Sequence, residues 1–259
     1  QLTDGRLAVH LIAGGSDADQ AKDGDHVDHA GRYRRLAEYA DVLRKTWTET
    51  APFDHAGEFY RIEGAYADVR CRQRPHIPIF GGGGSDAAIA ALAPHADVFM
   101  LWGEPLADTA AFMARVQAAA ATHGREIGFS LSTRPILAET DDKAWDRARD
   151  ILRQIEERGP PDKRSNVGSQ RLLAAAAAAE TYDSCLWMKL AQATGARGNS
   201  TALVGSPETV AKAMLEYYKL GAKSLLIRGY DPLPDAVQYG RELIPRVREL
   251  VAEADRAAA

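Results

Sequence analysis

The chain contains 259 residues, of which 46% are hydrophobic and 26% charged, and its formal net charge is −4 at pH 7. These values are typical of a globular protein with one substantial core, and they favour a single domain. Because the charge is slightly negative and there is no long basic run, the sequence argues against nucleic-acid binding and against a polybasic membrane anchor, which leaves small molecules as the expected ligands.

Five apolar runs, each followed by a helical pattern, recur along the chain. The first run, 7–15, precedes the pattern at 31–47, in which Leu36, Ala40 and Leu43 recur at helical spacing. The other runs cover 77–80, 97–105, 127–139 and 223–230. Because strands that alternate with helices pair in parallel, this order predicts a parallel sheet, either open or closed into a barrel.

Four consecutive glycines, 81–84, separate the run 77–80 from an alanine-rich helical segment that Ser85 or Asp86 is suited to cap. Glycines at such a turn let backbone N–H groups approach an anion, and the helix dipole favours negative charge there, so the pattern predicts a bound phosphate. A tight turn without a ligand is the alternative. The turn is neither a Walker A loop nor a complete dinucleotide fingerprint.

Residues 160–200 interrupt this alternation with a glycine-rich, partly basic stretch and an alanine run. Insertions of this length in compact domains are usually active-site lids or disordered loops. We interpret 160–200 as a mobile lid, and a purely structural insertion is the alternative.

Polar residues gather at the predicted carboxyl ends of the strands, where parallel α/β proteins bind their ligands. They supply a histidine, a phosphate turn, an aromatic wall and arginines, which we expect to form one site: His10, 82–85, Trp102, Glu104, Arg134, Arg228 and Tyr230. His10 could instead be a core histidine, Trp102 a packing residue and Glu104 a helix cap. The histidines do not fall at ligand spacing, so no metal site is expected.

The cysteines, the apolar stretches and the N-terminus indicate the cellular compartment of the protein. Cys71 and Cys185 form neither a disulfide framework nor a zinc pattern, which fits a reducing compartment. No apolar stretch approaches the length of a membrane span and no signal peptide is visible, so we expect a cytoplasmic protein. The chain begins with Gln1 rather than Met, and we expect an upstream portion to be missing.

Several segments, taken together, resemble successive landmarks of the bacterial luciferase-like flavin monooxygenases, and most closely the reduced-FMN-dependent alkanesulfonate monooxygenases. The resemblance runs from residue 7 to about 250, and its most specific part is the succession of GGGGSD, WGEP and TALVG. That family folds as TIM (β/α)8 barrels. The resemblance therefore implies an α/β fold in which residues 1–259 form the C-terminal part of a single barrel domain, with strands 4–8 present and the insertion 160–200 before strand 8.

The resemblance also implies a set of cofactor-binding residues. Ser85, the Tyr33 hydroxyl and the backbone of Gly82, Gly83 and Gly84 would hold the FMN phosphate. His10 occupies the place where the family usually has an asparagine near the flavin ring.

On the substrate side, Trp102 corresponds to the sulfonate pocket, Tyr230 to the tyrosine at the end of the last strand, and Arg197 approximately to an arginine of the family's mobile lid. The seventh strand departs from the family, which has Arg-x-His where this chain has Ser132-Thr133-Arg134. Arg134 remains as a cation for an anionic substrate.

The activity implied is two-component oxygenation, in which a partner flavin reductase supplies reduced FMN and the enzyme uses O2 to oxygenate a small, anionic, alkanesulfonate-like substrate. We also expect a homo-oligomer. Two alternatives stay open: an F420-dependent oxidoreductase of the same superfamily, and a non-redox phosphate-binding barrel.

Overall fold

The computed structural model describes residues 1–159 and 166–258, and within these ranges the chain forms two compact units. The first unit comprises residues 1–100 and 115–127, and the second comprises 101–114 and 128–259. The chain passes between them within strand β5 (Val98–Trp102) and within helix α4 (Leu106–Ala121). No helix in the described ranges combines the length and apolar character needed to span a membrane.

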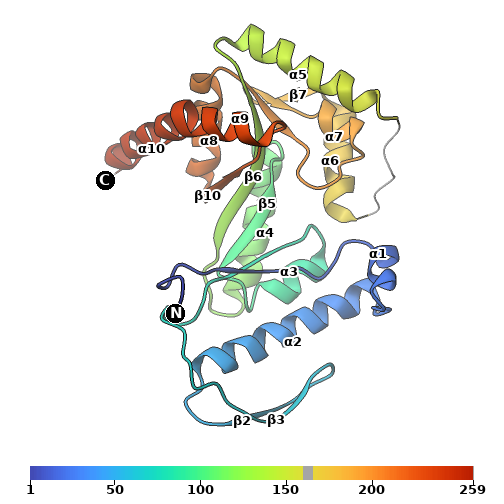
Figure 1. Ribbon diagram of the computed structural model, residues 1–259, viewed down its shortest axis with the longest axis vertical. Helices are drawn as coiled ribbons and strands as arrows, with labels where there is room; N and C mark the ends of the chain where they lie inside the picture. Colours follow the sequence, from blue (N-terminus) through green and yellow to red (C-terminus); the bar gives the residue numbers. More distant parts are fainter. Residues whose placement is uncertain (160–165, 259) are drawn as a thin grey trace. The chain divides into compact units, whose positions relative to one another are not determined.

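The first unit is built on a parallel sheet in which β4 (Ile79–Gly82) lies between β1 (Val9–Leu11) and the start of β5. The long helix α2 (His29–Thr48) packs on α3 (Asp86–Leu92), and a hairpin of β2 (Phe53–Ala56) and β3 (Arg61–Ala65) follows α2 (Figure 1). A short helix, α1 (Asp17–Lys22), precedes α2.

Helix α2 forms where its sequence pattern predicted it. Asp28 caps it by accepting a hydrogen bond of 2.7 Å from the Gly31 N–H. Leu36 and Ala40, four residues apart, are buried, as expected for an apolar stripe that faces a core. The hairpin is tied to the same helix by Glu38, whose carboxylate accepts hydrogen bonds from the backbone N–H groups of residues 59 and 60.

The second unit is organised around the long strand β6 (Gly128–Leu137). Its first half, 129–133, pairs in parallel with β10 (Ala222–Ile227), and its second half, 134–137, pairs in parallel with β9 (Ala202–Gly205). The covering helices are α5 (Asp141–Glu156), α8 (Pro207–Leu220), α9 (Pro232–Gln238) and α10 (Ile244–Ala258), with a π-helical turn (Tyr239–Leu243) between the last two.

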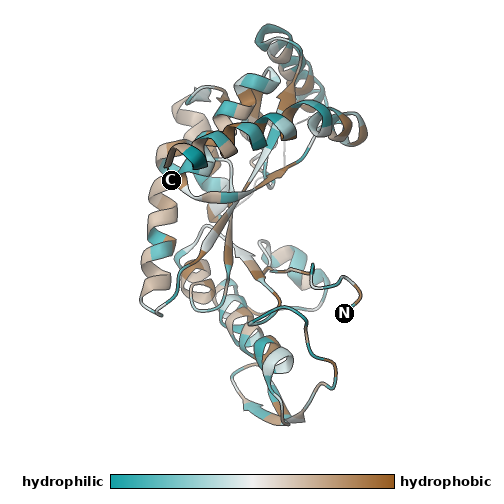
Figure 2. Ribbon diagram, turned by 90° about the vertical axis from the view of Figure 1, so that its left-hand side faces the viewer, coloured by the Kyte–Doolittle hydropathy of each residue, from teal (hydrophilic) through white to brown (hydrophobic). Residues whose placement is uncertain are grey.

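Apolar side chains of these elements form the core of the second unit. Ile136, Ala202 and Val204 of the sheet pack against Ala144 and Ala148 of α5. Figure 2 shows strongly apolar (brown) segments on the strands, whereas α10 carries both hydrophilic and apolar residues. Strand β9 comes from the TALVG landmark, which our reading of the apolar runs did not count, so the prediction of five strand–helix units was one strand short.

The insertion predicted at 160–200 is partly described. Its first residues, 160–165, lie outside the described part of the chain. The remainder forms α6 (Val167–Ala178), β7 (Thr181–Tyr182), β8 (Leu186–Trp187) and α7 (Lys189–Ala193), and β8 pairs antiparallel with β9. Trp187 is almost fully buried, so the described part of this segment contributes to the core of the second unit. The lid stays a prediction.

Candidate functional site

The residues predicted to form the site are divided between the two units. His10, Tyr33 and 82–85 belong to the first unit, which contains the glycine turn. Trp102, Arg134, Arg197 and Tyr230 belong to the second unit. Each unit therefore carries its own set of polar groups, one around the glycine turn and one around Arg134.

In the first unit, Ser85 caps α3 as predicted, because its hydroxyl accepts a hydrogen bond of 3.2 Å from the Ala88 N–H. Burial raises the pKa of the Tyr33 phenol, and the nearby Ser85 hydroxyl lowers it only in part, so the phenol is protonated at neutral pH. Outside the strand ladders, the backbone N–H groups of Gly83 and Gly84 donate no hydrogen bond to another described residue. The turn thus presents two hydroxyls and backbone N–H groups, which are donors that suit a phosphate.

The protein itself leaves no room for side chains at three of the four glycines. A Cβ atom at Gly81 would collide with the Leu92 side chain, and one at Gly82 would lie 2.9 Å from the Met100 carbonyl oxygen. At Gly83 a Cβ atom would lie 2.5 Å from the Tyr33 hydroxyl oxygen and 2.6 Å from the Ala88 Cβ. Internal packing therefore accounts for these glycines without a ligand, and it also brings the Tyr33 hydroxyl against the turn.

His10 lies on β1, where its partner in register is Phe80 of β4. Its side chain is exposed, so the alternative of a core histidine is wrong. Partial desolvation lowers the pKa of the imidazole, which keeps the ring neutral at pH 7. Beyond the end of β1, Ala13 packs against the cluster of Tyr33, Ala88 and Ala91, which joins the strand end to the residues beside the glycine turn.

Arg32 is a residue of the first unit that our sequence reasoning missed. Its side chain is buried, and it donates hydrogen bonds to the carbonyl oxygens of Ala13 (3.0 Å) and Val27 (2.6 Å) and to the carboxylate of Asp17 (2.6 Å). Arg32 thus fixes the loop after β1. Nothing in the helical pattern distinguished this arginine from Arg34, which is exposed, or from Arg35, which is half-buried.

In the second unit, Arg134 is held by neutral groups. Its Nε donates to the Asn199 carbonyl at 2.7 Å, its Nη1 donates to the Gly229 carbonyl at 3.4 Å, and its guanidinium lies 5.1 Å from the centre of the Tyr230 ring. No carboxylate of the described residues pairs with it. An ion pair with Glu104 is excluded as an explanation, because Glu104 binds Arg171 with both carboxylate oxygens.

Tyr230 places a phenol oxygen in the interior. This atom is buried and has no hydrogen-bond partner among the described residues. Burial raises the pKa of the Tyr230 phenol, and the neighbouring Arg134 lowers it only in part, so the phenol is protonated at neutral pH. Asn199, whose Nδ2 donates to the Ser132 hydroxyl at 2.8 Å, has a side-chain oxygen that is likewise buried and unpaired within the described chain.

Trp102 and Arg197 differ in how firmly the second unit holds them. Trp102 is half-buried, and a Cβ atom at Gly168 of α6 would lie 2.9 Å from its ring. Arg197 is exposed and forms no hydrogen bond or ion pair with another described residue. The structure brings Arg134, Tyr230 and Asn199 together, but it gives Arg197 no such contact.

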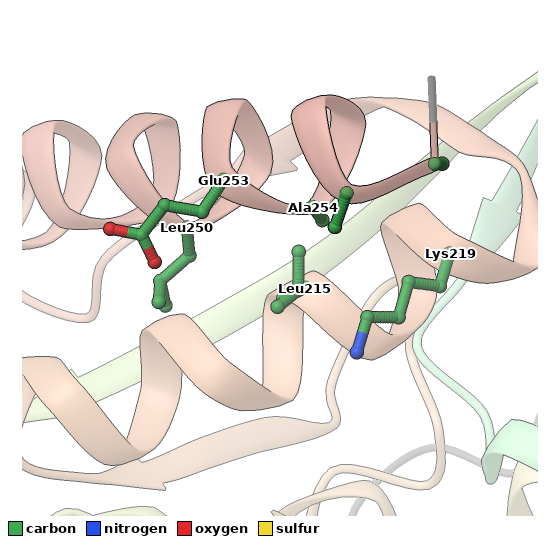
Figure 3. A pocket seen from close by; sticks show the side chains of 7 residues that line it. Leu215, Lys219, Leu250, Glu253 and Ala254 are labelled. Carbon is green, nitrogen blue, oxygen red and sulfur yellow. The ribbon is translucent and has the colours of Figure 1, made fainter.

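A groove of about 550 Å³ lies elsewhere, between α8 and α10 (Figure 3). Leu215 and Leu250 face each other across it, with Lys219 and Glu253 at its rim. It contains none of the predicted site residues. In the described ranges, no group of three or more His, Cys, Asp and Glu side chains could hold a metal ion.

Comparison with protein families gives one match of wide extent. The model of the luciferase-like monooxygenase family covers residues 1–224 of this chain. This match spans both units and includes the glycine turn, Trp102, Arg134 and Arg197, whereas Tyr230 lies just beyond it.

Solved structures with the same fold are distant in sequence. A riboflavin lyase with modified FMN and its substrate riboflavin has a TM-score of 0.75 and 19% identity, over 96% of this chain and 65% of that one. EDTA monooxygenase from Chelativorans sp. BNC1 has a TM-score of 0.74 and 17% identity, over 96% of this chain and 67% of that one. An F420-dependent secondary alcohol dehydrogenase has a TM-score of 0.67 and 14% identity, over 95% of this chain and 71% of that one.

These likenesses confirm the predicted α/β fold with a parallel sheet and covering helices, of the luciferase-like type. At such identities they concern the fold alone. The chain spans 65% of the length of the riboflavin lyase structure that it matches.

Proposed function

Because the chain belongs to the luciferase-like monooxygenase family, we propose that it acts as a two-component flavin monooxygenase on a small anionic organic substrate. A separate flavin reductase supplies the reduced FMN. When bound, reduced FMN supplies the electrons that activate O2, and the protein contributes binding, orientation and exclusion of water.

The observation that carries this proposal is the pair of hydroxyls beside the glycine turn. The Tyr33 hydroxyl lies against Gly83, the Ser85 hydroxyl caps the helix, and the backbone N–H groups of Gly83 and Gly84 precede that helix. These neutral donors suit a phosphate monoester at a helix N-terminus, where the dipole adds to the attraction. We assign the FMN phosphate to Ser85, Tyr33 and the backbone of 82–84, and we place His10 beside the flavin ring.

Arg134 supports an anionic substrate. Among the described residues, this half-buried guanidinium contacts only carbonyl oxygens and a ring, which do not compensate its charge, and a bound anion would offset its desolvation. Tyr230, protonated at neutral pH, can donate a hydrogen bond or a proton to an oxyanion. We assign Trp102 to the wall of the substrate pocket and Arg197 to a second contact with the anion. An alkanesulfonate is the substrate class that we test first.

The alternative of an F420-dependent oxidoreductase is supported by the structural likeness to an F420-dependent alcohol dehydrogenase. Titration of the chain with FMN, reduced FMN and F420, followed by fluorescence, separates the two. We expect FMN to bind, and Ser85→Ala to weaken it. If neither cofactor binds, a non-redox barrel is favoured.

Turnover is tested by adding a flavin reductase, O2 and alkanesulfonates and measuring sulfite. Sulfite released only in the complete mixture is the expected result. Binding of FMN without sulfite release would leave the flavin assignment standing and would contradict the sulfonate as substrate. Sedimentation velocity tests the expected homo-oligomer.

A further inference from the structure

A buried carboxylate organises the turn that carries Tyr230. Asp235 of α9 is 2% exposed, and its Oδ2 accepts hydrogen bonds from the backbone N–H groups of Tyr230 (2.7 Å) and Asp231 (2.9 Å). Its Oδ1 accepts a hydrogen bond from Nη2 of Arg147 in α5. The carboxylate is thus shared between the turn after β10 and a helix 88 residues earlier in the chain.

Both neighbours of this carboxylate are fixed in turn. The Nη1 of Arg147 donates to the Leu137 carbonyl at 3.0 Å, which anchors the arginine at the end of β6. A Cβ atom at Gly229 would collide with the Asp235 carboxylate, so the turn can pass at this distance only because residue 229 has no side chain. The carbonyl of Gly229 accepts the hydrogen bond from Arg134. Asp235 therefore contacts the turn that carries Tyr230 and whose Gly229 carbonyl binds Arg134.

Capping of α9 explains only part of this arrangement. Asp231 is the N-cap residue, so its bond to Asp235 belongs to the cap, whereas the Tyr230 N–H lies one residue before the cap and Arg147 comes from another helix. A surface cap would need no cationic partner, whereas a carboxylate in the interior is costly unless it is paired. Arg147 provides that pairing from another element.

We propose that Asp235 and Arg147 are a positioning pair that fixes the turn 228–231 and thereby holds the Tyr230 ring against the Arg134 guanidinium. Neither residue needs to touch the substrate. The consequence for turnover rests on the proposed function, but the positioning itself does not.

The Tyr230 phenol reports on this positioning without any cofactor. Its oxygen is buried, and burial raises its pKa above the ordinary value of a tyrosine. If the turn loosens, the ring gains access to water, and its ionisation should move toward pH ~10, where exposed tyrosines titrate. Carbon-13 NMR of the full chain labelled at tyrosine Cζ measures this, and Tyr230→Phe identifies the resonance.

We compare Asp235→Asn and Arg147→Met with Arg149→Met, a matched control on the same helix whose partner, Asp146, is largely exposed. In the unchanged chain and in Arg149→Met, the Tyr230 resonance should stay constant at the pH where exposed tyrosines ionise. In Asp235→Asn and Arg147→Met, the Tyr230 resonance should shift over the pH range in which exposed tyrosines ionise. If either variant fails to fold, Arg147→Lys, which keeps the charge but cannot reach both acceptors, provides the same readout.

A Tyr230 resonance that stays constant in the folded Asp235→Asn and Arg147 variants would overturn the proposal. Because this measurement uses no flavin, failure of the proposed function leaves it intact. Conversely, if the resonance moves and the variants lower kcat with KM unchanged while FMN affinity is kept, positioning and function are both supported.

Discussion

Replacing Gly83 by alanine should damage the first unit from within, whether or not flavin is bound. The new Cβ atom would lie 2.5 Å from the Tyr33 hydroxyl oxygen and 2.6 Å from the Ala88 Cβ, both far below van der Waals contact. Overpacking of this kind costs about 1–3 kcal/mol.

Urea denaturation of the Gly83→Ala chain measures this loss. Gly15→Ala is the matched control, because a Cβ atom there meets nothing within 4 Å, and its effect should stay within about 0.5 kcal/mol. Adding Tyr33→Phe removes one of the two collisions, so Gly83→Ala should cost less in that background, by roughly 0.5 kcal/mol or more. Equal stability of Gly83→Ala and Gly15→Ala would refute the packing argument.

Further predictions concern the second unit. Arg134→Met should abolish turnover of anionic substrates and leave FMN affinity nearly unchanged; full activity with a lowered Tm would instead make Arg134 structural. Limited proteolysis within 160–200 should be slowed by flavin plus substrate, and equal cleavage in both states would contradict the lid. Hydrogen bonds from Arg246 and then Lys212 lower the pKa of Glu208 from 4.5 to about 2. The Glu208 contribution to stability is therefore complete above pH ~4.5 and is lost as the pH falls through about 2. Glu208→Gln should accordingly lower Tm at pH 7 but have little effect at pH 2. Added salt should reduce the loss of Tm at pH 7, because solvent screens these charges. An equal change of Tm at both pH values would contradict this.

Local patterns in the sequence were sufficient for much of the fold. The 3.6-residue spacing in α2 and the Ser85 cap depend on neighbours within a few residues, and both appear as predicted. Strand β9 was missed because residues 202–205 were interpreted only as part of the TALVG landmark, although they are as long as the run 77–80 that was predicted as a strand. Its place is fixed by pairing with β6, which the sequence does not reveal.

The site was less predictable because its determinants are tertiary. The glycines were interpreted as room for a ligand, and the structure adds that Leu92, Tyr33 and the Met100 carbonyl already occupy the space. Asp235 reads as an ordinary helix-start carboxylate, since its partner Arg147 is remote in the chain. A buried charge is recognised only when its partner is known.

The half-buried arginines of the second unit differ in whether a carboxylate neutralises them. An arginine without a carboxylate partner is the better candidate for binding an anionic ligand. Arg147 is neutralised by Asp235 and Arg171 by Glu104, so each already has the anion that a buried cation requires. Arg134 contacts only the carbonyls of Asn199 and Gly229 and the ring of Tyr230 among the described residues, and these contacts orient the guanidinium without cancelling its charge. We therefore expect a bound anion to offset the desolvation of Arg134, and we propose that the turn contacted by Asp235 holds the guanidinium in position for that anion.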